Sequence, residues 1–298
     1  MLKKIASFQF FFAALILPSL PLPAIGVIVE NKMKAAASAD SKNDLPSELE
    51  EYLDLLMKHP ETFGPNGCWQ NGEIEIMTNP ALIHKIEKQT RLRLLSKGCD
   101  DSEAANWSKV GVVAEDNYWV WVRDAVIFPS GVYGTYDRLM WKSGMGGPPG
   151  AAILPLLANK KIVVNVHYRH ATRSWEIEIP RGQKKEGETL EKAAARELCE
   201  ETGYYISKCT FLGTIAPDTG VLMTVIPVYC GEVNHSGETQ KEYSEAIATN
   251  PAFTKDELKQ GFARGYIETP IKGLLVKVNC RDPFLAYALL QAELKGLF

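Results

Sequence analysis

The sequence predicts an α/β fold of the α+β kind, in which a mixed β-sheet is combined with several helices. Strand-like apolar segments begin near residue 110 and are found at 109–116, 118–128, 151–158, 161–169, 210–215 and 222–228. Segments with helical spacing and capping residues lie before, between and after these strands. Helix and strand patterns mixed along one chain are typical of α/β and α+β domains.

The composition indicates a globular protein with a sizeable core. Of the 298 residues, 46% are hydrophobic, and the formal net charge is −3. A nucleic-acid-binding surface usually needs an excess of basic residues, so we expect no nucleic-acid partner. The net charge does not argue against a small anionic substrate, because a bound cation can offset the charge of such a molecule.

The first 29 residues form an apolar segment behind a positively charged start. No charged residue occurs between Lys4 and Glu30, which is typical of a secretory signal peptide or a membrane anchor. Three prolines interrupt the segment and favour a signal peptide, with Ala24 as a conceivable cleavage point. We therefore expect export or membrane attachment, and membrane contact would then run through this segment. A cytoplasmic location is the alternative.

Residues 30–65 are predicted to form a linker followed by a helix. The first part, 30–43, is charged and rich in alanine and serine. Residues 47–59 have a helical pattern, and Ser47 and Glu50 have the spacing of a capping box.

A better marked helix follows. Asn79 is placed to cap it, Pro80 occupies the first helical position, and Gly98 is expected to end it. Cys68 and Cys99 flank this helix and could pair if the chain is exported. Free thiols are the alternative, and the sequence does not decide between the two.

Another helix is predicted over residues 190–202. Thr189 is placed to cap its N-terminus, and Gly203 stands where a left-handed residue ends a helix. Three residues share the apolar face that would pack this helix on the sheet: Leu190, Ala194 and Leu198.

Three glutamates gather near the C-terminal end of this helix. Glu197 and Glu201 lie only about 40° apart around the helix axis, and Glu200 flanks them. Like charges at this spacing repel, and the helix dipole disfavours negative charge in the last turn. The cluster therefore calls for a cation, and its hard oxygen ligands suit Mg²⁺ or Mn²⁺. A solvated acidic face is the alternative.

The spacing of the whole stretch resembles the Nudix box, Gly-x5-Glu-x7-Arg-Glu-apolar-x-Glu-Glu-x-Gly-apolar. The residues in register with it are Gly182, Glu188, Arg196, Glu197, Leu198, Glu200, Glu201, Gly203 and Tyr204. Tyr204 is the one departure, because an aliphatic residue is usual there, and it affects packing more than chemistry. The resemblance implies a Nudix-type α/β/α sandwich with a mixed sheet, here preceded by an N-terminal extension.

The resemblance also implies roles for residues of the box. Glu197 and Glu201 would bind metal, Glu200 would be a further ligand and take part in catalysis, and the main-chain carbonyl of Arg181 would also coordinate. Two other residues are implied to be architectural, holding the loop against the helix by charge pairing: Glu188 and Arg196.

The segment before the box resembles that of ADP-ribose pyrophosphatase-type Nudix enzymes. These enzymes carry an aromatic-Arg pair followed by Glu-x-Pro-x-Gly, and Tyr168-Arg169 and residues 178–182 match both elements. The resemblance implies that Arg169 binds substrate phosphate and that Glu178 supports substrate or metal. The alternatives are an exposed edge charge for Arg169 and a water-facing carboxylate for Glu178.

In this subfamily the catalytic base is often a glutamate on a loop well after the box. A Glu-x-Ile sequence followed by a helix favours Glu245 for this role, with Glu242 next. A solvated acidic loop is the alternative for both residues. Residues 216–220 stand where the family has a substrate loop that contains proline and glycine.

Strands ahead of the core often help to form a dimer and part of the substrate pocket in ADP-ribose pyrophosphatases. We therefore assign residues 66–137 to such a subdomain and residues 138–298 to the Nudix hydrolase domain. In a homodimer, Arg123 is a candidate substrate contact from the partner chain. Ordinary core packing is the alternative for these aromatic-rich strands.

The predicted function is Mg²⁺-dependent hydrolysis of the pyrophosphate bond of a nucleoside diphosphate derivative, with Mn²⁺ as the other candidate cation. ADP-ribose, giving AMP and ribose 5-phosphate, is the leading substrate. Nucleotide sugars and dinucleoside polyphosphates are alternative substrates, and a non-catalytic Nudix-like binding module is the alternative function. The box carboxylates are all present, which favours the enzyme.

Overall fold

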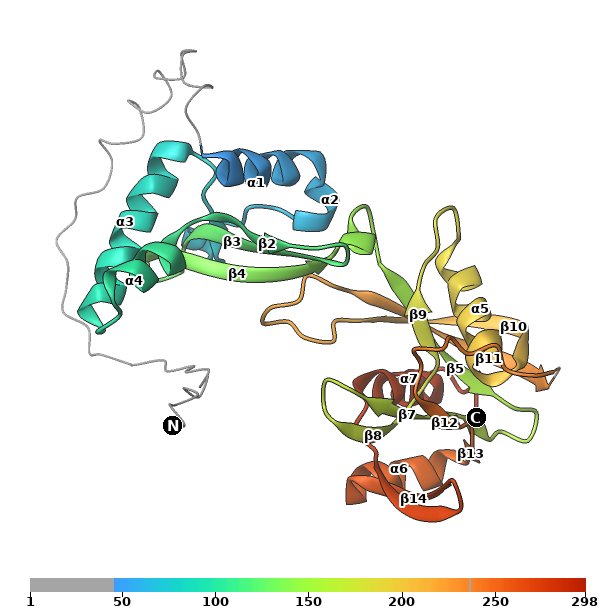
Figure 1. The fold of residues 1–298 in the computed structure, drawn as a ribbon. Coiled ribbons are helices and arrows are strands. Elements are labelled where there is room, and N and C mark those ends of the chain that lie inside the picture. The colour runs from blue at the N-terminus through green and yellow to red at the C-terminus, as the bar shows by residue number, and fades with distance from the viewer. Residues whose placement is uncertain (1–45, 236) are drawn as a thin grey trace, which may run out of the picture. The chain divides into compact units, whose positions relative to one another are not determined.

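A computed structural model describes residues 46–235 and 237–298 (Figure 1). Within these ranges, no helix combines the length and the apolar character that crossing a membrane requires. The segment interpreted as a signal peptide or membrane anchor, residues 1–29, and the linker at 30–43 lie outside the described residues, so both remain predictions.

The helices and strands follow one another in a mixed order, as expected. The helices are α1 (Ser47–Lys58), α2 (Pro60–Phe63), α3 (Pro80–Ser96), α4 (Asp101–Ser108), α5 (Leu190–Thr202), α6 (Lys255–Arg264) and α7 (Pro283–Leu294). The strands are β1 (Glu75–Ile76), β2 (Gly111–Glu115), β3 (Trp119–Ile127), β4 (Tyr133–Trp141), β5 (Gly150–Leu156), β6 (Ile162–Val163), β7 (Asn165–Arg169), β8 (Ser174–Glu178), β9 (Arg181–Gln183), β10 (Tyr204–Ile215), β11 (Ile226–His235), β12 (Ile247–Thr249), β13 (Ala252–Phe253), β14 (Tyr266–Ile271) and β15 (Leu274–Asn279).

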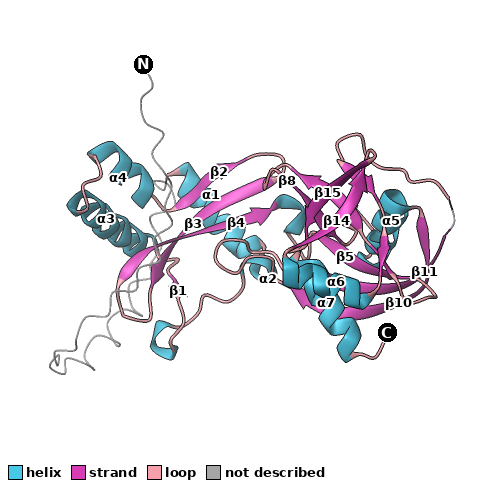
Figure 2. Cartoon of the chain, turned by 90° about the horizontal axis from the view of Figure 1, so that it is seen from below, coloured by secondary structure: helices cyan, strands magenta, loops and turns pink. Residues whose placement is uncertain are grey.

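An antiparallel sheet forms the N-terminal part of the described chain. Its long strand β3 pairs with β1, β2 and β4, and Figure 2 shows β2, β3 and β4 side by side. Tyr52 of α1 donates a hydrogen bond to Asp124 (2.6 Å), and Asp124 is ion-paired with Arg138 of β4. Arg138 also donates to the carbonyl of Phe63 (3.1 Å). These contacts attach the helices of residues 47–63 to the sheet.

β4 was not predicted as a strand. It runs from Tyr133 to Trp141 and so includes residue 137, the last residue that we assigned to the N-terminal subdomain. The division into domains remains a prediction. Its polar residues concealed the strand, because several of them find partners only in the folded chain. Asp137 pairs with Arg123 of β3, and Tyr136 donates to the carbonyl of Gly220 (2.7 Å).

The fold class is confirmed in the C-terminal part. A six-stranded sheet has the order β10-β11-β5-β6-β13, with β9 also on β5, and it is mixed because β5 and β11 run parallel. Residues of β5 alternate between two faces. Ala151 and Ile153 pack with Ala194 and Leu198 of α5, whereas Leu154 packs in the core that contains α7. The sheet is therefore covered by α5 on one face and α7 on the other (Figure 1).

The segment 161–169 was predicted as a single strand and is divided at Val164. β6 pairs with β13 in the six-stranded sheet, whereas β7 pairs with β8 and β12 in a second sheet of order β12-β7-β8-β15-β14. Its apolar sequence reads as one strand because both halves are extended and buried. The division is set by strand partners that lie far away in the sequence.

The predicted helix cap at Asn79 is confirmed, because its side chain accepts a hydrogen bond from the backbone N–H of Leu82. Thr254 and Asp282 cap α6 and α7 in the same way, and Thr254 forms a complete capping box with Glu257. The capping box at Ser47 is wrong, because α1 is preceded by Pro46 and has no side-chain cap. The Ser47 hydroxyl instead hydrogen-bonds to Glu48.

Other local predictions were incomplete. The helix α4 and the hairpin of β14 and β15 were not predicted, and β11 begins at Ile226 rather than at residue 222. The thiols of Cys68 and Cys99 are free, which is the second of the two alternatives left open.

Candidate active site

α5 is fixed at both ends and along one side. Thr189 accepts a hydrogen bond from the backbone N–H of Lys192 (3.2 Å), and Gly203 ends the helix in the left-handed conformation. Ala194 and Leu198 are fully buried against the sheet, as expected for the predicted apolar face. Because these contacts set the rotation of the helix, they also determine where its glutamates point.

Three carboxylates converge at one place, two from α5 and one from the loop before β12. Oxygen atoms of Glu197, Glu201 and Glu245 all lie within 4.8 Å of one another. Of the two candidates for the catalytic base, Glu245 therefore reaches the cluster. Glu242 remains exposed, and its backbone N–H donates to Glu245 (3.1 Å).

Glu200 lies beside the cluster, and its carboxylate forms ion pairs with two basic side chains. Its carboxylate pairs with Arg196 (2.8 Å) and with Lys185 (3.5 Å). Arg196 also binds Glu188 (3.0 Å) and Glu197 (2.7 Å), which matches the charge pairing predicted between Glu188 and Arg196. The guanidinium of Arg196 thus joins the loop to the helix and holds Glu200 toward the edge of the site.

Burial makes the carboxylate cluster costly to ionise. It raises the pKa of Glu201 to about 8, and the neighbouring charges of Glu245 and Glu197 act in the same direction. Burial also raises the pKa of Glu197 and of Glu245. The donor set consists of carboxylate oxygens, which suits a hard divalent cation such as Mg²⁺ or Mn²⁺. A cation at this place would remove the electrostatic cost, so these residues fit the metal predicted from the sequence.

The backbone of β9 passes directly against this cluster. A Cβ atom added to Gly182 would overlap with the carboxyl group of Glu197, so only glycine leaves the space that this carboxylate occupies. The preceding residue, Arg181, pairs with Ala152 of β5. Coordination by the Arg181 carbonyl remains a prediction.

Two guanidinium groups share the carboxylate of Glu178. Arg169 donates to it from Nε (2.8 Å), and Nη2 of Arg181 lies 3.3 Å from it. Arg181 also pairs with Asp282 (2.8 Å) and lies over the ring of Phe284 (4.5 Å to the centroid). Glu178 is only 3% exposed and therefore does not face water. Arg169 is half-buried, with its side chain in the cavity described next.

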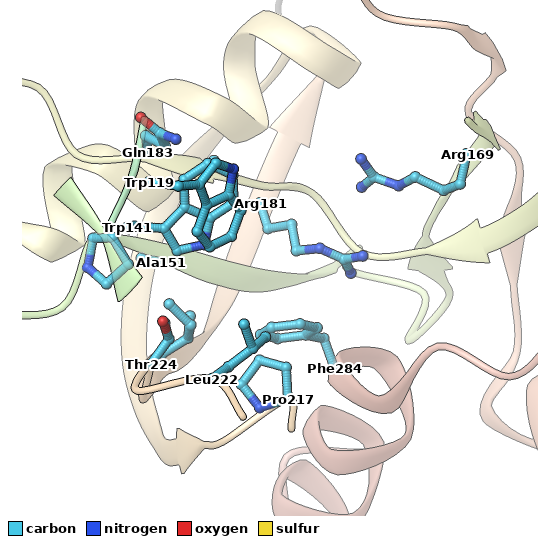
Figure 3. A pocket seen from close by; sticks show the side chains of 14 residues that line it. Trp119, Trp141, Ala151, Arg169, Arg181, Gln183, Pro217, Leu222, Thr224 and Phe284 are labelled. Carbon is cyan, nitrogen blue, oxygen red and sulfur yellow. The ribbon is translucent and has the colours of Figure 1, made fainter. Parts of the chain in front are cut away.

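A cavity of about 390 Å³ lies beside the two arginines (Figure 3). The rings of Trp119 and Trp141, from β3 and β4, lie against each other on one side, with centroids 3.5 Å apart and planes inclined by 31°. Phe284, Leu222 and Pro217 line the other side in Figure 3. Neither tryptophan was singled out from the sequence, because their pairing depends on β4.

The predicted substrate loop, residues 216–220, and the residues that directly follow it are held by β4. Leu139 donates its backbone N–H to the carbonyl of Val221 (2.9 Å), and Met223 donates back to Leu139 (3.0 Å). With the bond from Tyr136 to Gly220, these contacts fix residues 217–224 along the cavity wall.

Arg123 is not brought to the carboxylate cluster or to this cavity. It is buried in the N-terminal sheet, where it pairs with Asp137 (2.7 Å) and donates to the carbonyl of Asn106 (3.0 Å). These contacts account for its charge within the described chain. A role toward a partner chain remains a prediction.

Sequence interpretation missed two polar residues of β7. Asn165 donates to Glu201 (2.6 Å), and His167 lies 4.0 Å from Glu178. Burial lowers the pKa of His167 to about 4, so the ring is neutral at ordinary pH. Two polar side chains inside an otherwise apolar strand are the signal that could have revealed them.

Comparison with known proteins adds a family match and several partial relatives. Residues 147–264 match the family described as NUDIX domain. The chain is 33% identical over 98 residues to an ADP-ribose pyrophosphatase of Bacillus subtilis (strain 168), covering 33% of this chain and 53% of that protein. It is 31% identical over 121 residues to a methanol dehydrogenase activator of Bacillus methanolicus, covering 40% of this chain and 63% of that protein.

A third relative is an NAD-capped RNA hydrolase NudC of Vibrio vulnificus (strain CMCP6), 32% identical over 108 residues, with 36% of this chain and 38% of that protein covered. The chain thus spans less than two thirds of the length of each of these relatives. A crystal structure of an ADP compounds hydrolase has a TM-score of 0.47 and 19% sequence identity, covering 63% of this chain and 93% of that chain.

Proposed function

We propose that this chain, which carries a Nudix domain at residues 147–264, hydrolyses the phosphoanhydride bond of a nucleoside diphosphate derivative with the help of a divalent cation. The observation that carries the proposal is the convergence of Glu197, Glu201 and Glu245 within 4.8 Å, next to a cavity lined by Arg169 and Arg181. Carboxylates for a cation and guanidinium groups for phosphate are the two requirements of this chemistry.

Each part of the site has a task in this reaction. Glu197 and Glu201, with the carbonyl of Arg181, would hold Mg²⁺ or Mn²⁺, which offsets the charge of the diphosphate and makes water more acidic. Glu245 takes a proton from the attacking water. The water oxygen bonds to phosphorus while the bridging phosphorus–oxygen bond breaks, and the leaving phosphate departs as an anion.

Arg169 and Arg181 are the residues we assign to the phosphate oxygens. Both guanidinium groups line the cavity, and each keeps N–H groups beyond those used for Glu178 and Asp282. Glu178 orients both groups, because it binds the two arginines at once. Planar guanidinium groups held in this way suit bidentate contact with phosphate.

The remaining walls favour a substrate with a flat, partly apolar group. The indoles of Trp119 and Trp141 and the ring of Phe284 give the cavity aromatic surface, on which a nucleobase can stack. Of the candidate substrates, we place ADP-ribose first, with AMP and ribose 5-phosphate as products. Its two phosphates would lie near the arginines and its base near the tryptophans.

The test is a substrate panel with purified full-length protein. ADP-ribose, a nucleotide sugar, a dinucleoside polyphosphate and NAD⁺ are incubated with Mg²⁺, with Mn²⁺ and with a chelator, and nucleotide products are separated chromatographically. We expect cation-dependent release of AMP, fastest from ADP-ribose. Tight binding of a panel member without turnover of any of them would overturn the hydrolase and leave a binding module.

A further inference from the structure

Two amide side chains, one buried and one half-buried, are linked by hydrogen bonds to Glu201. Asn165 is 2% exposed and donates from Nδ2 to Oε2 of Glu201 (2.6 Å). Asn250 in turn donates from Nδ2 to Oδ1 of Asn165 (2.7 Å). Neither asparagine lies within residues 182–204, the stretch whose spacing identified the carboxylate cluster.

The direction of these two hydrogen bonds matters. An asparagine side chain offers a donor at one end and an acceptor of nearly the same shape at the other. Because Asn250 donates to the oxygen of Asn165, the NH₂ group of Asn165 must face Glu201. The two hydrogen bonds end on the carboxylate of Glu201, whose Oε2 atom is thereby held in one position.

The backbone gives both asparagines a fixed position. Val164 donates its N–H to the carbonyl of Pro251 (3.0 Å). On one side of this hydrogen bond β6 pairs with β13, and on the other side β7 pairs with β12. Asn165 and Asn250 thus lie where the chain passes from one sheet to the other. The segment that carries Asn250 also carries Glu245. It therefore contributes one carboxylate to the cluster directly and contacts Glu201 indirectly, through Asn165.

We propose that Asn165 and Asn250 are positioning residues for the divalent cation. Asn165 occupies one oxygen of Glu201 and leaves the other for the metal, and Asn250 keeps the amide of Asn165 from rotating. Partners of this kind behind a metal ligand typically change metal affinity by about 10–100-fold when they are removed. The inference rests on the proposed metal site, and it is independent of which substrate is hydrolysed.

The test measures Mn²⁺ binding to full-length protein without substrate, by the loss of the free-ion electron paramagnetic resonance signal. Asn165→Leu keeps the branched shape of the side chain and removes the donor, so we expect Mn²⁺ affinity to fall by about 10–100-fold. Asn250→Ala should change it in the same direction and by less. Thr269→Val is the matched control, since Thr269 is equally buried in β14, and we expect its Mn²⁺ affinity to equal that of the wild type.

A purely structural role would lower the melting temperature of metal-free protein and leave the Mn²⁺ affinity of the folded variant unchanged. Wild-type affinity in folded Asn165→Leu would therefore overturn the inference. If that variant does not fold, Asn250→Ala decides in the same way. Absence of Mn²⁺ binding by the wild type would overturn the metal site itself, which is a different result from binding that the substitutions leave unaffected.

Discussion

Asp124 in the N-terminal sheet and Glu201 of α5 are equally buried carboxylates with opposite surroundings. Asp124 is 1% exposed and receives a guanidinium from Arg138 (2.9 Å) and a hydroxyl from Tyr52 (2.6 Å). Glu201 is 3% exposed, receives the neutral amide of Asn165, and lies next to Glu197 and Glu245. A buried charge is usually paired or bound to a metal. The two carboxylates are therefore equally buried, and their hydrogen-bond and charge partners distinguish them. Asp124 has cationic and hydroxyl partners within the fold, whereas the carboxylates around Glu201 fit a bound cation.

The largest expected effects come from removing the charge at each place. Asp124→Asn leaves Arg138 without its partner, and breaking such a buried pair costs about 3–5 kcal/mol of unfolding free energy. Glu201→Gln removes a metal ligand and relieves repulsion. We therefore expect unchanged or higher stability of the metal-free protein and a loss of kcat/KM of at least about a hundredfold, beyond that typical of a residue behind a ligand.

Denaturant unfolding and initial rates per folded molecule check both variants side by side. The distinction between the two carboxylates would be wrong if Glu201→Gln kept near-normal turnover. It would also be wrong if Asp124→Asn lost turnover while remaining fully folded.

The buried carboxylate of Glu201 should also make the stability of the metal-free protein depend on pH. Burial raises the pKa of Glu201 from 4.5 to about 8, so the folded metal-free protein binds a proton that the unfolded chain releases. Stability from this group is present at low pH and is lost as the pH rises toward 8. His167 acts in the opposite sense, because its lowered pKa makes folded protein less stable as the pH falls from 6.5 to about 4.

Between pH 6.5 and about 8, His167 no longer changes its charge, whereas Glu201 still does. Across this pH range, metal-free protein should lose about 2 kcal/mol of unfolding free energy, and Glu201→Gln should lose much less. Urea titrations at several pH values in the presence of a chelator measure both slopes. Parallel slopes for the two proteins would refute the assignment to Glu201.

A smaller effect is expected where the N-terminal sheet contributes to the cavity. Trp119→Ala should raise KM about tenfold with kcat little changed, since stacking contributes ~1–3 kcal/mol per base. Trp121→Ala is the control, because Trp121 is on the same face of β3, is 38% exposed and does not line the cavity. Steady-state kinetics with ADP-ribose measure both, and equal KM values for the two variants would remove Trp119 from the substrate site.

Features set by short stretches of sequence could be predicted. The limits of α5 follow from Thr189 and Gly203, and the grouping of Glu197 and Glu201 follows from helical periodicity. Glu245 was favoured over Glu242 by resemblance alone, and the fold brings only Glu245 into the cluster of three.

Features set by distant partners could not be predicted. Asn165 binds Glu201 only because the strand of residues 161–169 changes sheets at Val164. Trp119 and Trp141 meet only because β3 and β4 pair in one register, and the polar sequence of β4 concealed that strand. The failed cap at Ser47 has a simpler cause, since Pro46 takes the capping position instead.

Gly182 shows why a site of this kind tolerates little variation at a position that performs no chemistry. Its backbone does not adopt the left-handed conformation, yet any side chain there would occupy the space of the Glu197 carboxyl group. Gly203 is constrained both by a φ of 76° and by the backbone carbonyl of Gly237, which a Cβ atom at this position would overlap. Replacements at Gly182 would therefore act by displacing the Glu197 carboxyl group from the cluster, whereas replacements at Gly203 would strain the backbone turn that ends α5.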